Sequence, residues 1–285
     1  MEIKLLSVIV PIYKKENTVK KELNNIYSVL SKTPYIFELV AVIDGTSLDK
    51  SLEKAKSLKL SNLKVYGYKT NKGKGQAVRF GMQKSKGDVV MFIDSGGDIN
   101  PEGIVMMLEH MKWYGADVII GSKLHSASRV NPYPLKRKIL TYGYYMGVKF
   151  LFGLKTRDTQ TGLKAYKRKV LEKVLDRLVI KRFAFDVEIL AVADHLGFKK
   201  IFDCPVEVNW DKSNSSISGI FSKNGIWPFV LDTLAIFYRL KILRFYDDGI
   251  KRDWIYDKEL KLKILTGGVG ESFYKRFFAR LFAPH

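Results

Sequence analysis

The apolar residues of this 285-residue chain gather in short runs that longer amphipathic stretches separate. Each run has the length of a β-strand; together they cover residues 7–10, 37–43, 63–68, 89–93 and 118–120. Between the first two runs, apolar residues recur at helical spacing, at Val19, Leu23, Ile26, Tyr27 and Leu30. The pattern predicts a βαβ series, and therefore an α/β protein with a parallel sheet that helices cover.

Two aspartates come directly after predicted strands. Asp44 follows the second run and Asp94 the fourth, and ligands of such sheets bind at the carboxyl ends of the strands. Asp94 also opens the sequence Asp-Ser-Gly-Gly-Asp, which ends at Asp98. One interpretation is a turn whose glycines adopt positive φ and whose acids are solvated or cap the next helix. The other is a pair of carboxylates, Asp94 and Asp98, that binds a divalent cation through oxygen ligands.

A second glycine-containing loop, NKGKGQAVRFG at residues 71–81, leads into a predicted helix. It is not a Walker loop, because no Gly-Lys-Ser/Thr follows, and Val78 stands where a dinucleotide-binding loop needs its third glycine. Lys74 and the helix N-terminus are suited to hold a phosphate. An ordinary helix start is the alternative interpretation.

Composition narrows the choice of partner. The chain carries 49 Lys and Arg against 29 Asp and Glu, a net charge of +20, which favours nucleic acid, phospholipid headgroups or a phosphorylated substrate. Nucleic acid is the least favoured, because the basic residues are dispersed and lack a recognition-helix signature. Cys204 is the single cysteine, so neither an internal disulfide nor a Cys/His zinc site is expected, and a reducing cytoplasm fits best. The N-terminal apolar run breaks at Pro11 and is interpreted as a strand, not a leader.

Taken in order, several motifs resemble those of the family-2 inverting glycosyltransferases of GT-A fold. They are SVIVPIYKKENTV from residue 7, ELVAVIDGTSLD from residue 38, and NKGKGQAVRFGMQKSKGDVVMFIDSGGDINPEG from residue 71. Two further stretches, RDTQTGLKAY from residue 157 and KRFAFDVEILAVADHLGFKKIFDCPVEVNW from residue 181, are similar to the branch that transfers sugars to polyprenyl phosphates. Within that branch the dolichyl-phosphate glucosyltransferases look nearest, and the resemblance covers residues 7–210.

The resemblance implies a GT-A fold: α/β, with a Rossmann-like, mostly parallel sheet and helices on both faces. It implies an inverting, metal-dependent hexosyltransferase that uses Mg²⁺ or Mn²⁺. The expected donor is a nucleotide diphospho-sugar, UDP-glucose first and GDP-mannose second, and the expected acceptor is a polyprenyl (dolichyl) phosphate. Residues that match the family's motifs are the candidate site. The donor candidates are Pro11, Tyr13, Glu16, Asp44, Gly73, Lys74 and Gly75; the cation candidates are Asp94 and Asp98; the catalytic candidates are Asp94, Asp98, Asp158, Gln160, Lys123 and Arg129.

Some positions depart from the family pattern. The motif ELVAVIDGTSLD resembles the family's nucleotide-binding element, but Ile43 and Leu48 stand where the family has acids. Asp44 is therefore the more certain contact with the nucleotide. In the metal motif, Gly96 occupies the place of the second acid, and Asp98 follows two positions later. The acid is therefore displaced, not lost. A catalytically silent nucleotide-binding protein is kept as one alternative on this ground.

The expected acceptor needs little acid–base help. A phosphate monoester has a second pKa near ~6 and is mostly dianionic at pH 7. Asp158 is therefore expected to position the acceptor or the sugar, and an ion pair with Arg157 or another neighbour is the structural alternative. If the acceptor is instead a hydroxyl of a glycan, the second functional alternative, Asp158 would serve as general base. Gln160 is either a sugar contact or an ordinary polar loop residue.

Further charged residues fit two interpretations each. Lys123, Arg129 and Arg137 are either a clamp on the acceptor phosphate or solvated surface charges, and a lysine lacks the bidentate fork of arginine. Asp186 and Glu188 match the family's motif and begin a predicted helix. Carboxylates at that end of a helix can simply interact favourably with the helix dipole.

The chain is predicted to consist of a catalytic domain at 1–210 and a C-terminal amphipathic, membrane-proximal helical extension at 211–285. The apolar run at 226–238 is shorter than the ~20 residues that span a bilayer. It packs on the catalytic domain or on a second copy of the chain, or docks at the membrane interface. Residues 273–282 place large apolar side chains on one half of a helix and cations on the other, as docking on an anionic membrane requires. We therefore expect a peripheral protein on the cytoplasmic face of a membrane.

Overall fold

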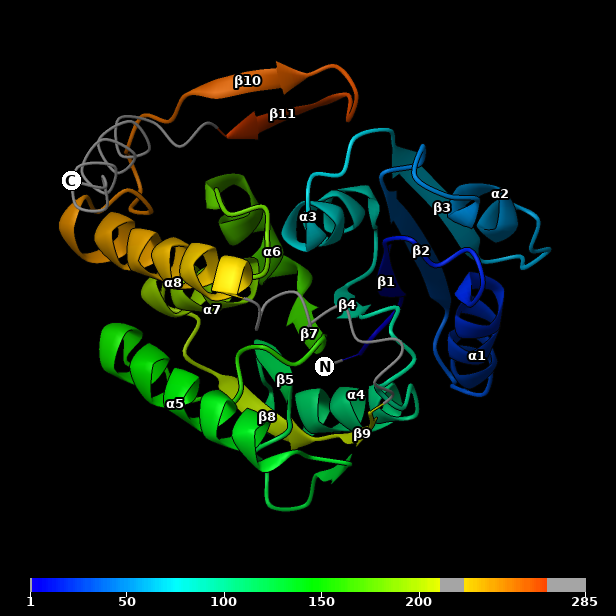
Figure 1. Cartoon of the computed structure of the whole chain (residues 1–285), viewed down its shortest axis with the longest axis horizontal. Coiled ribbons are helices and arrows are strands. Elements are labelled where there is room, and N and C mark those ends of the chain that lie inside the picture. Colours follow the sequence, from blue (N-terminus) through cyan, green and yellow to red (C-terminus); the bar gives the residue numbers. More distant parts are fainter. Residues whose placement is uncertain (1, 211–222, 266–285) are drawn as a thin grey trace.

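The computed structural model describes residues 2–210 and 223–265, and its centre is a seven-stranded sheet (Figure 1). In spatial order the strands are β3 (Leu63–Tyr68), β2 (Phe37–Asp44), β1 (Leu6–Ile12), β4 (Val89–Ile93), β7 (Leu163–Lys167), β5 (Val118–Ser122) and β8 (Ile201–Pro205). All neighbouring pairs are parallel except the two that involve β7. The five strands predicted from the apolar runs are confirmed, and the sheet is mostly parallel as expected.

Helices cover both faces of this sheet, which explains why a central strand such as β4 is apolar throughout. Successive side chains of a strand point to opposite faces, so Val8 and Val10 enter one core while Ile9 enters the other. One core lies under α1 (Val19–Ser31), α2 (Ser51–Lys56) and α4 (Gly103–Tyr114). The other lies under α3 (Lys74–Lys84), α6 (Arg168–Val174), the 3-10 turn η1 (Leu175–Arg177) and α7 (Phe185–His195).

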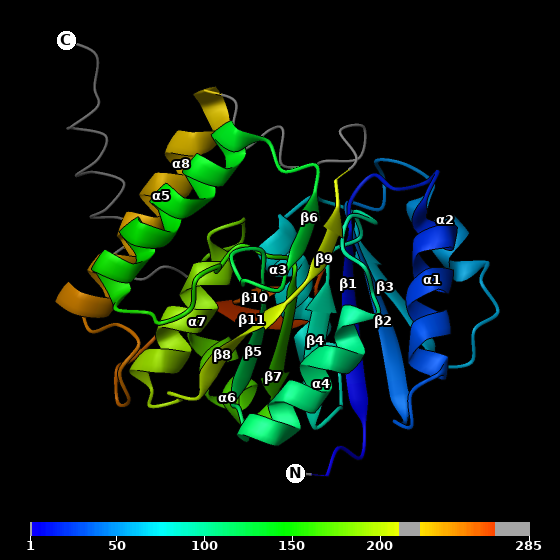
Figure 2. The same ribbon diagram turned by 90° about the horizontal axis from the view of Figure 1, so that it is seen from below.

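Two longer helices, α5 (Leu135–Phe152) and α8 (Lys223–Phe237), lie side by side at one end of the sheet (Figures 1 and 2). The Tyr144 and Phe229 rings are 4.7 Å apart, and the Tyr144 and Thr233 hydroxyls share a hydrogen bond of 3.2 Å. A short π-helix, η3 (Tyr238–Ile242), continues α8. Among the described residues, no helix is long and apolar enough to cross a membrane.

The remaining strands form two small sheets. β6 (Arg129–Asn131) pairs with β9 (Glu207–Asn209), and β10 (Trp254–Asp257) forms an antiparallel hairpin with β11 (Leu262–Leu265). The described part of the C-terminal extension does not stand apart from the catalytic region. Ile236, Leu240, Tyr246 and Leu265 are buried in the same core as residues of the central sheet. The apolar run at 226–238 therefore packs on the catalytic region, while the amphipathic tail predicted at 273–282 lies outside the described residues.

The reversed direction of β7 brings two distant loops together. β4 ends at Ile93, which pairs with Leu163 at the start of β7, so the residues after β4 and those before β7 meet at one edge. The backbone N–H of Asp94 donates to the carbonyl of Gly162 at 2.8 Å. This edge is where the candidate site residues gather.

Candidate active site

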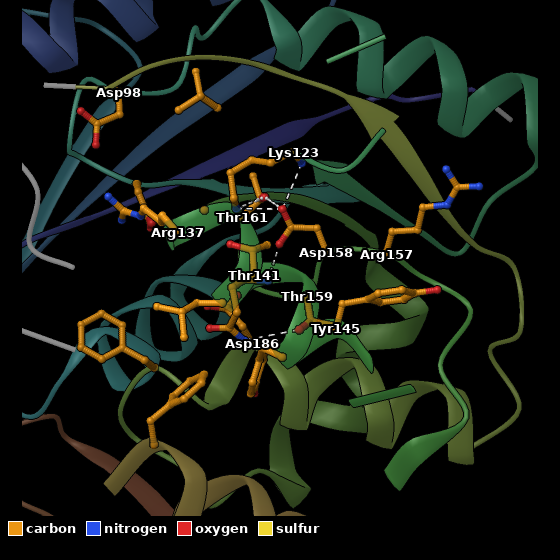
Figure 3. Close-up of a pocket in the computed structure, with 18 of the residues that line it drawn as sticks. Asp98, Lys123, Arg137, Thr141, Tyr145, Arg157, Asp158, Thr159, Thr161 and Asp186 are labelled. Carbon is orange, nitrogen blue, oxygen red and sulfur yellow. Dashed lines mark hydrogen bonds and ion pairs between the residues drawn. The ribbon is translucent and has the colours of Figure 1, made fainter. Parts of the chain in front are cut away.

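A cavity of about 480 Å³ opens at this edge of the sheet. One wall is polar and carries Asp94, Asp98, Lys74, Lys123 and Asp158; the other is apolar and comes largely from α5 and α8. Figure 3 shows the polar wall, with the Asp158 carboxylate turned toward Lys123 and Thr161 and with Asp98 and Arg137 at the far end. The cavity thus joins charged groups to an apolar surface.

Asp94 stands where β4 ends, and its two oxygens have different surroundings. Oδ2 accepts a hydrogen bond of 2.9 Å from the Lys74 ammonium. Oδ1 is buried and has no hydrogen-bond partner among the described residues. Gly162 makes this placement possible, because a Cβ on Gly162 would lie 1.9 Å from Oδ2. The carboxylate therefore occupies space that a side chain at position 162 would fill.

Asp98 lines the same cavity after the chain turns at residues 95–97. Gly97 has φ of +70°, a conformation that favours glycine. The loop is fixed beyond the turn, since the Asn209 N–H donates to the Asp98 carbonyl at 2.7 Å and Ile99 bridges to Val208. The structure thus brings both predicted acids to one cavity. Within the described part of the chain, no group of three or more His, Cys, Asp or Glu is placed to hold a metal ion.

The two acids fit a divalent cation in their chemistry. Asp94 Oδ1 is an acceptor with no partner in the part of the chain that the structure describes, and Asp98 adds a second carboxylate. Cations such as Mg²⁺ are commonly held by one or two carboxylates together with substrate phosphates. A pair of acids is therefore compatible with a cation that arrives with a diphosphate.

Lys74 belongs to a buried chain of alternating charges. Its ammonium lies 2.9 Å from Asp94 and 3.3 Å from Asp186, and Asp186 also accepts from Lys164 at 2.6 Å. Burial would lower the pKa of Lys74, but the charges of Asp186 and Asp94 outweigh burial and raise this pKa above its usual value. Asp186 thus does more than favour a helix dipole, because it holds two lysines beside the cavity. Lys164 is fully buried and also donates to the carbonyl of Thr161 at 2.6 Å.

Asp158 is surrounded by donors from its own loop and from Lys123, which follows β5. Oδ2 accepts from the Lys123 backbone at 3.0 Å and from the Thr161 hydroxyl at 2.6 Å, and it lies 2.8 Å from the Lys123 ammonium. Oδ1 accepts from the Gln160 N–H at 3.0 Å. Burial would raise the pKa of Asp158, but the Lys123 charge and these hydrogen bonds outweigh it and lower that pKa. The ion-pair partner is Lys123, whereas the Arg157 backbone binds Asp203. Asp158 is therefore ionised, and both of its oxygens already accept hydrogen bonds, which makes it a poor candidate for a general base.

The other predicted catalytic residues fall in different places. Gln160 lines the cavity, and so does Lys123. Arg129 is exposed on β6, outside the cavity, whereas Arg137 at the start of α5 lines the cavity and stacks on the Trp210 ring. Burial lowers the pKa of Arg137 to about 10, which still leaves this residue charged at pH 7. Of the two predicted arginines, Arg137 is therefore the one that lines the cavity, and Arg157 lines it as well.

Asp44, Gly73, Lys74 and Gly75, four of the predicted donor residues, lie in or beside the loop at residues 70–75, here termed the glycine loop. Asp44 accepts hydrogen bonds from the Lys72 N–H at 2.7 Å and the Gly73 N–H at 2.9 Å. A Cβ on Gly73 would lie 2.7 Å from the Lys181 carbonyl, and one on Gly75 would lie 2.5 Å from Phe185. The glycines therefore let the loop pack closely against residues 181–185, and Asp44 fixes its backbone.

The opening turn after β1 carries the remaining donor candidates. Pro11 is buried within β1, and Tyr13 is 42% exposed just beyond it. Glu16 accepts from the Lys50 N–H at 3.0 Å, while its own N–H donates to Asp49 at 3.0 Å. Of all the predicted donor residues, Lys74 is the one that lines the cavity.

Residues 7–175 match the model of the family described as Glycosyl transferase family 2. The chain belongs to this family. A dolichyl-phosphate beta-glucosyltransferase of Drosophila melanogaster is 30% identical to this glycosyltransferase over 226 residues, which is 74% of this chain and 68% of the relative. A Dictyostelium discoideum protein of the same description is 30% identical over 237 residues, covering 77% and 70%.

Solved structures share the fold of this glycosyltransferase. Mannosyl-3-phosphoglycerate synthase from Rubrobacter xylanophilus has a TM-score of 0.63 at 13% identity, covering 94% of this chain and 89% of the other. Glucosyl-3-phosphoglycerate synthase from Mycobacterium tuberculosis, in a complex with Mn²⁺ and UDP, has a TM-score of 0.59 at 17% identity, covering 88% and 85%. The expected GT-A fold is confirmed.

Sequence reasoning singled out neither Gly162 nor Lys164 in this glycosyltransferase. Both lie in the RDTQTGLKAY motif, from which Asp158 and Gln160 were chosen. The available signal for Lys164 was its place between the apolar residues Leu163 and Ala165, since an unpaired buried charge is costly. Nothing in the sequence signals the close approach of Gly162 to Asp94.

Proposed function

We propose that this glycosyltransferase moves a hexose, with glucose as the first candidate, from a nucleotide diphospho-sugar to a polyprenyl phosphate with inversion. The observation that carries the proposal is the two-sided cavity, whose charged wall faces an apolar wall from α5 and α8. A polyprenyl phosphate has the same two parts, an anionic head and an apolar chain. The dolichyl-phosphate beta-glucosyltransferases among the relatives support the same acceptor.

The proposed step is a direct displacement. An oxygen of the acceptor phosphate forms a bond to the anomeric carbon while the bond from that carbon to the donor's β-phosphate oxygen breaks. The nucleoside diphosphate leaves with the bonding electrons, and the configuration inverts. Asp94 and Asp98 would hold Mg²⁺ or Mn²⁺, which supplies positive charge for the leaving diphosphate. Lys123 and Arg137, both on the cavity wall, are placed to hold the acceptor phosphate.

The surroundings of Asp158 favour a phosphate acceptor over a hydroxyl. A hydroxyl nucleophile needs a base to remove its proton, whereas a phosphate dianion does not. Asp158 accepts from Lys123, Gln160 and Thr161 and has a lowered pKa. We propose that it fixes the position of Lys123 and leaves the acceptor to react without proton transfer.

The outer surface of α5 and α8 supports a peripheral location on a membrane, which we place on the cytoplasmic face. Phe150 is 89% exposed and Trp227 61% exposed. Ile139 and Leu140 are also exposed, and they line the cavity as well. The apolar surface therefore runs from the helices into the site. If α5 and α8 lie at the membrane interface, a lipid phosphate would be presented directly to Lys123 and Arg137.

The test uses the purified full chain with labelled UDP-glucose or GDP-mannose, Mn²⁺, and either dolichyl phosphate or dolichol. The two lipids differ only in the phosphate, so dolichol is the matched control. We expect lipid-linked product from dolichyl phosphate alone, with UDP-glucose as the better donor. Transfer to dolichol or to a glycan would overturn the proposed acceptor. Bound nucleotide without transfer to any acceptor would overturn the proposed activity.

A further inference from the structure

The C-terminal hairpin of β10 and β11 contacts the glycine loop through two acidic residues. The Asp257 carboxylate lies 2.8 Å from the Lys72 ammonium. Glu259 uses both oxygens: Oε1 accepts from the Thr70 N–H at 2.9 Å, and Oε2 lies 3.4 Å from the Lys72 ammonium. Asp257 and Lys72 are 185 positions apart in the chain. Figure 1 shows the hairpin reaching over the end of the sheet where β3 and α3 lie.

The turn of the hairpin is shaped to present these acids. Asp257 Oδ1 accepts from the Glu259 and Leu260 N–H groups, each at 3.0 Å, which leaves Oδ2 for Lys72. Leu260 and Leu265 are 2% and 3% exposed and belong to the core shared with the central sheet. The two acids therefore stand on a hairpin that is anchored in the catalytic region.

The glycine loop is held on its opposite side by the catalytic region itself. Asp44 accepts from the Lys72 and Gly73 N–H groups, and the Lys181 carbonyl accepts from the Gln76 N–H at 3.0 Å. Lys72 is thus fixed twice, through its backbone by Asp44 and through its side chain by the hairpin. Lys74, which lies between Asp94 and Asp186, comes two residues later. The glycine loop that leads to Lys74 is therefore attached on two sides.

We propose that Asp257 and Glu259 are positioning residues for the donor. They hold the glycine loop, through Lys72 and Thr70, in the conformation that receives the nucleoside diphosphate, and they do not touch the donor. This inference rests on the proposed function for the identity of the ligand. A loop ordered before binding costs less conformational entropy on binding, so its loss appears as weaker donor affinity.

The first experiment compares the full chain with an Asp257→Asn/Glu259→Gln variant, whose side chains keep their size. Lys258→Gln, an exposed residue of the same turn, is the matched control. Titration calorimetry with UDP and with GDP, each with Mn²⁺, should show affinity lowered about tenfold in the double variant and unchanged in the control. The KM for the sugar nucleotide should rise in step, while kcat and the KM for the lipid phosphate stay at the wild-type values.

Two further variants separate positioning from a general loss of structure. Lys72→Gln removes the other partner and should weaken nucleotide binding by a similar factor. Lys72→Glu combined with Asp257→Lys reverses the pair and should recover part of the affinity that either single change loses. Unchanged thermal unfolding of the double variant, together with weaker nucleotide binding, supports a positioning role.

The outcomes also separate this inference from the proposed function. Wild-type protein that transfers sugar, with a double variant that binds nucleotide equally well, would overturn the inference and leave the function intact. Tighter nucleotide binding by the double variant would also overturn the inference. It would show that the ion pairs with Asp257 and Glu259 prevent Lys72 from binding the phosphates of the donor. Wild-type protein that binds nucleotide without transfer, with weaker binding by the double variant, supports the inference while the proposed function fails.

Discussion

At Gly162 the absence of a side chain decides where a carboxylate lies. A Cβ at this position would be 1.9 Å from Asp94 Oδ2, far inside contact distance. Both neighbouring strands are fixed by pairing, so the backbone has little room to move away. The position of Asp94 is therefore set by a residue that carries no chemistry of its own.

We expect Gly162→Ala to lower the transfer rate by about 100-fold, because displacement of a catalytic group by about 1 Å has an effect of this size. Initial rates at saturating donor and Mn²⁺ measure it. Gly147→Ala is the control, since a Cβ on Gly147 meets nothing within 4 Å. Full activity of Gly162→Ala would show that Asp94 can move aside at no catalytic cost.

Asp94 and Asp98 should differ in what their loss does. Asp94→Asn should abolish transfer, because Asp94 also holds Lys74. Asp98→Asn should raise the Mn²⁺ concentration for half-maximal rate by at least about tenfold, with a smaller effect on the rate at saturating metal. Rates measured over a Mn²⁺ series test this. An unchanged metal requirement in Asp98→Asn would leave Asp98 with a structural role in the loop.

The pH dependence of transfer should follow the acceptor and not Asp158. The pKa of Asp158 is lowered in the folded protein, so this carboxylate is ionised at every pH above its ordinary range. The acceptor phosphate gains its second negative charge as pH rises through ~6, and the rate should rise with it. The Asp158→Asn variant should keep this rise of the rate with pH, although its rate should be lower than that of the wild type at every pH. A flat profile in the variant would assign the titration to Asp158.

Motifs located the acids, but not their partners. Asp44, Asp94 and Asp158 follow from their places beside predicted strands or in a recognisable motif. The contacts of Asp158 with Lys123 and of Asp186 with Lys74 join residues far apart in the chain, so they depend on how the strands are ordered in space. Arg129 and Arg137 illustrate the same limit, since only the fold determines which arginine faces the cavity.

At the scale of elements, alternating apolar runs were sufficient to predict five strands and the helices between them. The direction of β7 was not predictable from these runs, because a strand covered on both faces has the same composition whether it runs parallel or antiparallel. The pairing of α5 with α8 was equally hidden. It rests on aromatic contacts, such as Tyr144 with Phe229, between segments distant in sequence.

The exposed apolar side chains of α5 and α8 form the surface that we propose meets lipid. We expect Phe150→Glu combined with Trp227→Glu to weaken binding to anionic vesicles by more than about tenfold, since burial of each such side chain contributes roughly 1.5–3 kcal/mol. Liposome flotation of the full chain measures it. Trp113→Glu is the control, because Trp113 is 87% exposed on α4, which covers the other face of the sheet. An equal loss in the control would remove α5 and α8 from this role.

At the scale of the whole molecule, the described part of the C-terminal extension behaves as part of the catalytic core. Tyr246 donates to Glu188 of α7 at 2.7 Å, and Ile236 of α8 is completely buried. The sequence predicted a boundary at residue 210 because the motifs end there. Motifs report the site, whereas the extent of a core depends on which apolar residues pack together.

We therefore expect Ile236→Ala to lower the free energy of unfolding of the whole protein by about 2–5 kcal/mol, as large-to-small changes in a core do. Urea denaturation followed by tryptophan fluorescence and by far-UV circular dichroism measures it. The two signals should move together to lower urea concentration in one transition. A separate early transition confined to one signal would show that the extension unfolds on its own.

The antiparallel pairing of β5 with β7 has a consequence for how such an enzyme diversifies. The chain leaves the sheet at Ser122 and returns at Leu163, at the same edge, after an excursion that contains α5 and Arg137. Residues 123–162 make up this stretch, and they include Lys123 and Arg137, whereas Asp94 and the glycine loop lie outside it. We therefore expect a change of acceptor to map mainly to substitutions in this one continuous stretch, while the residues proposed to hold the donor stay the same.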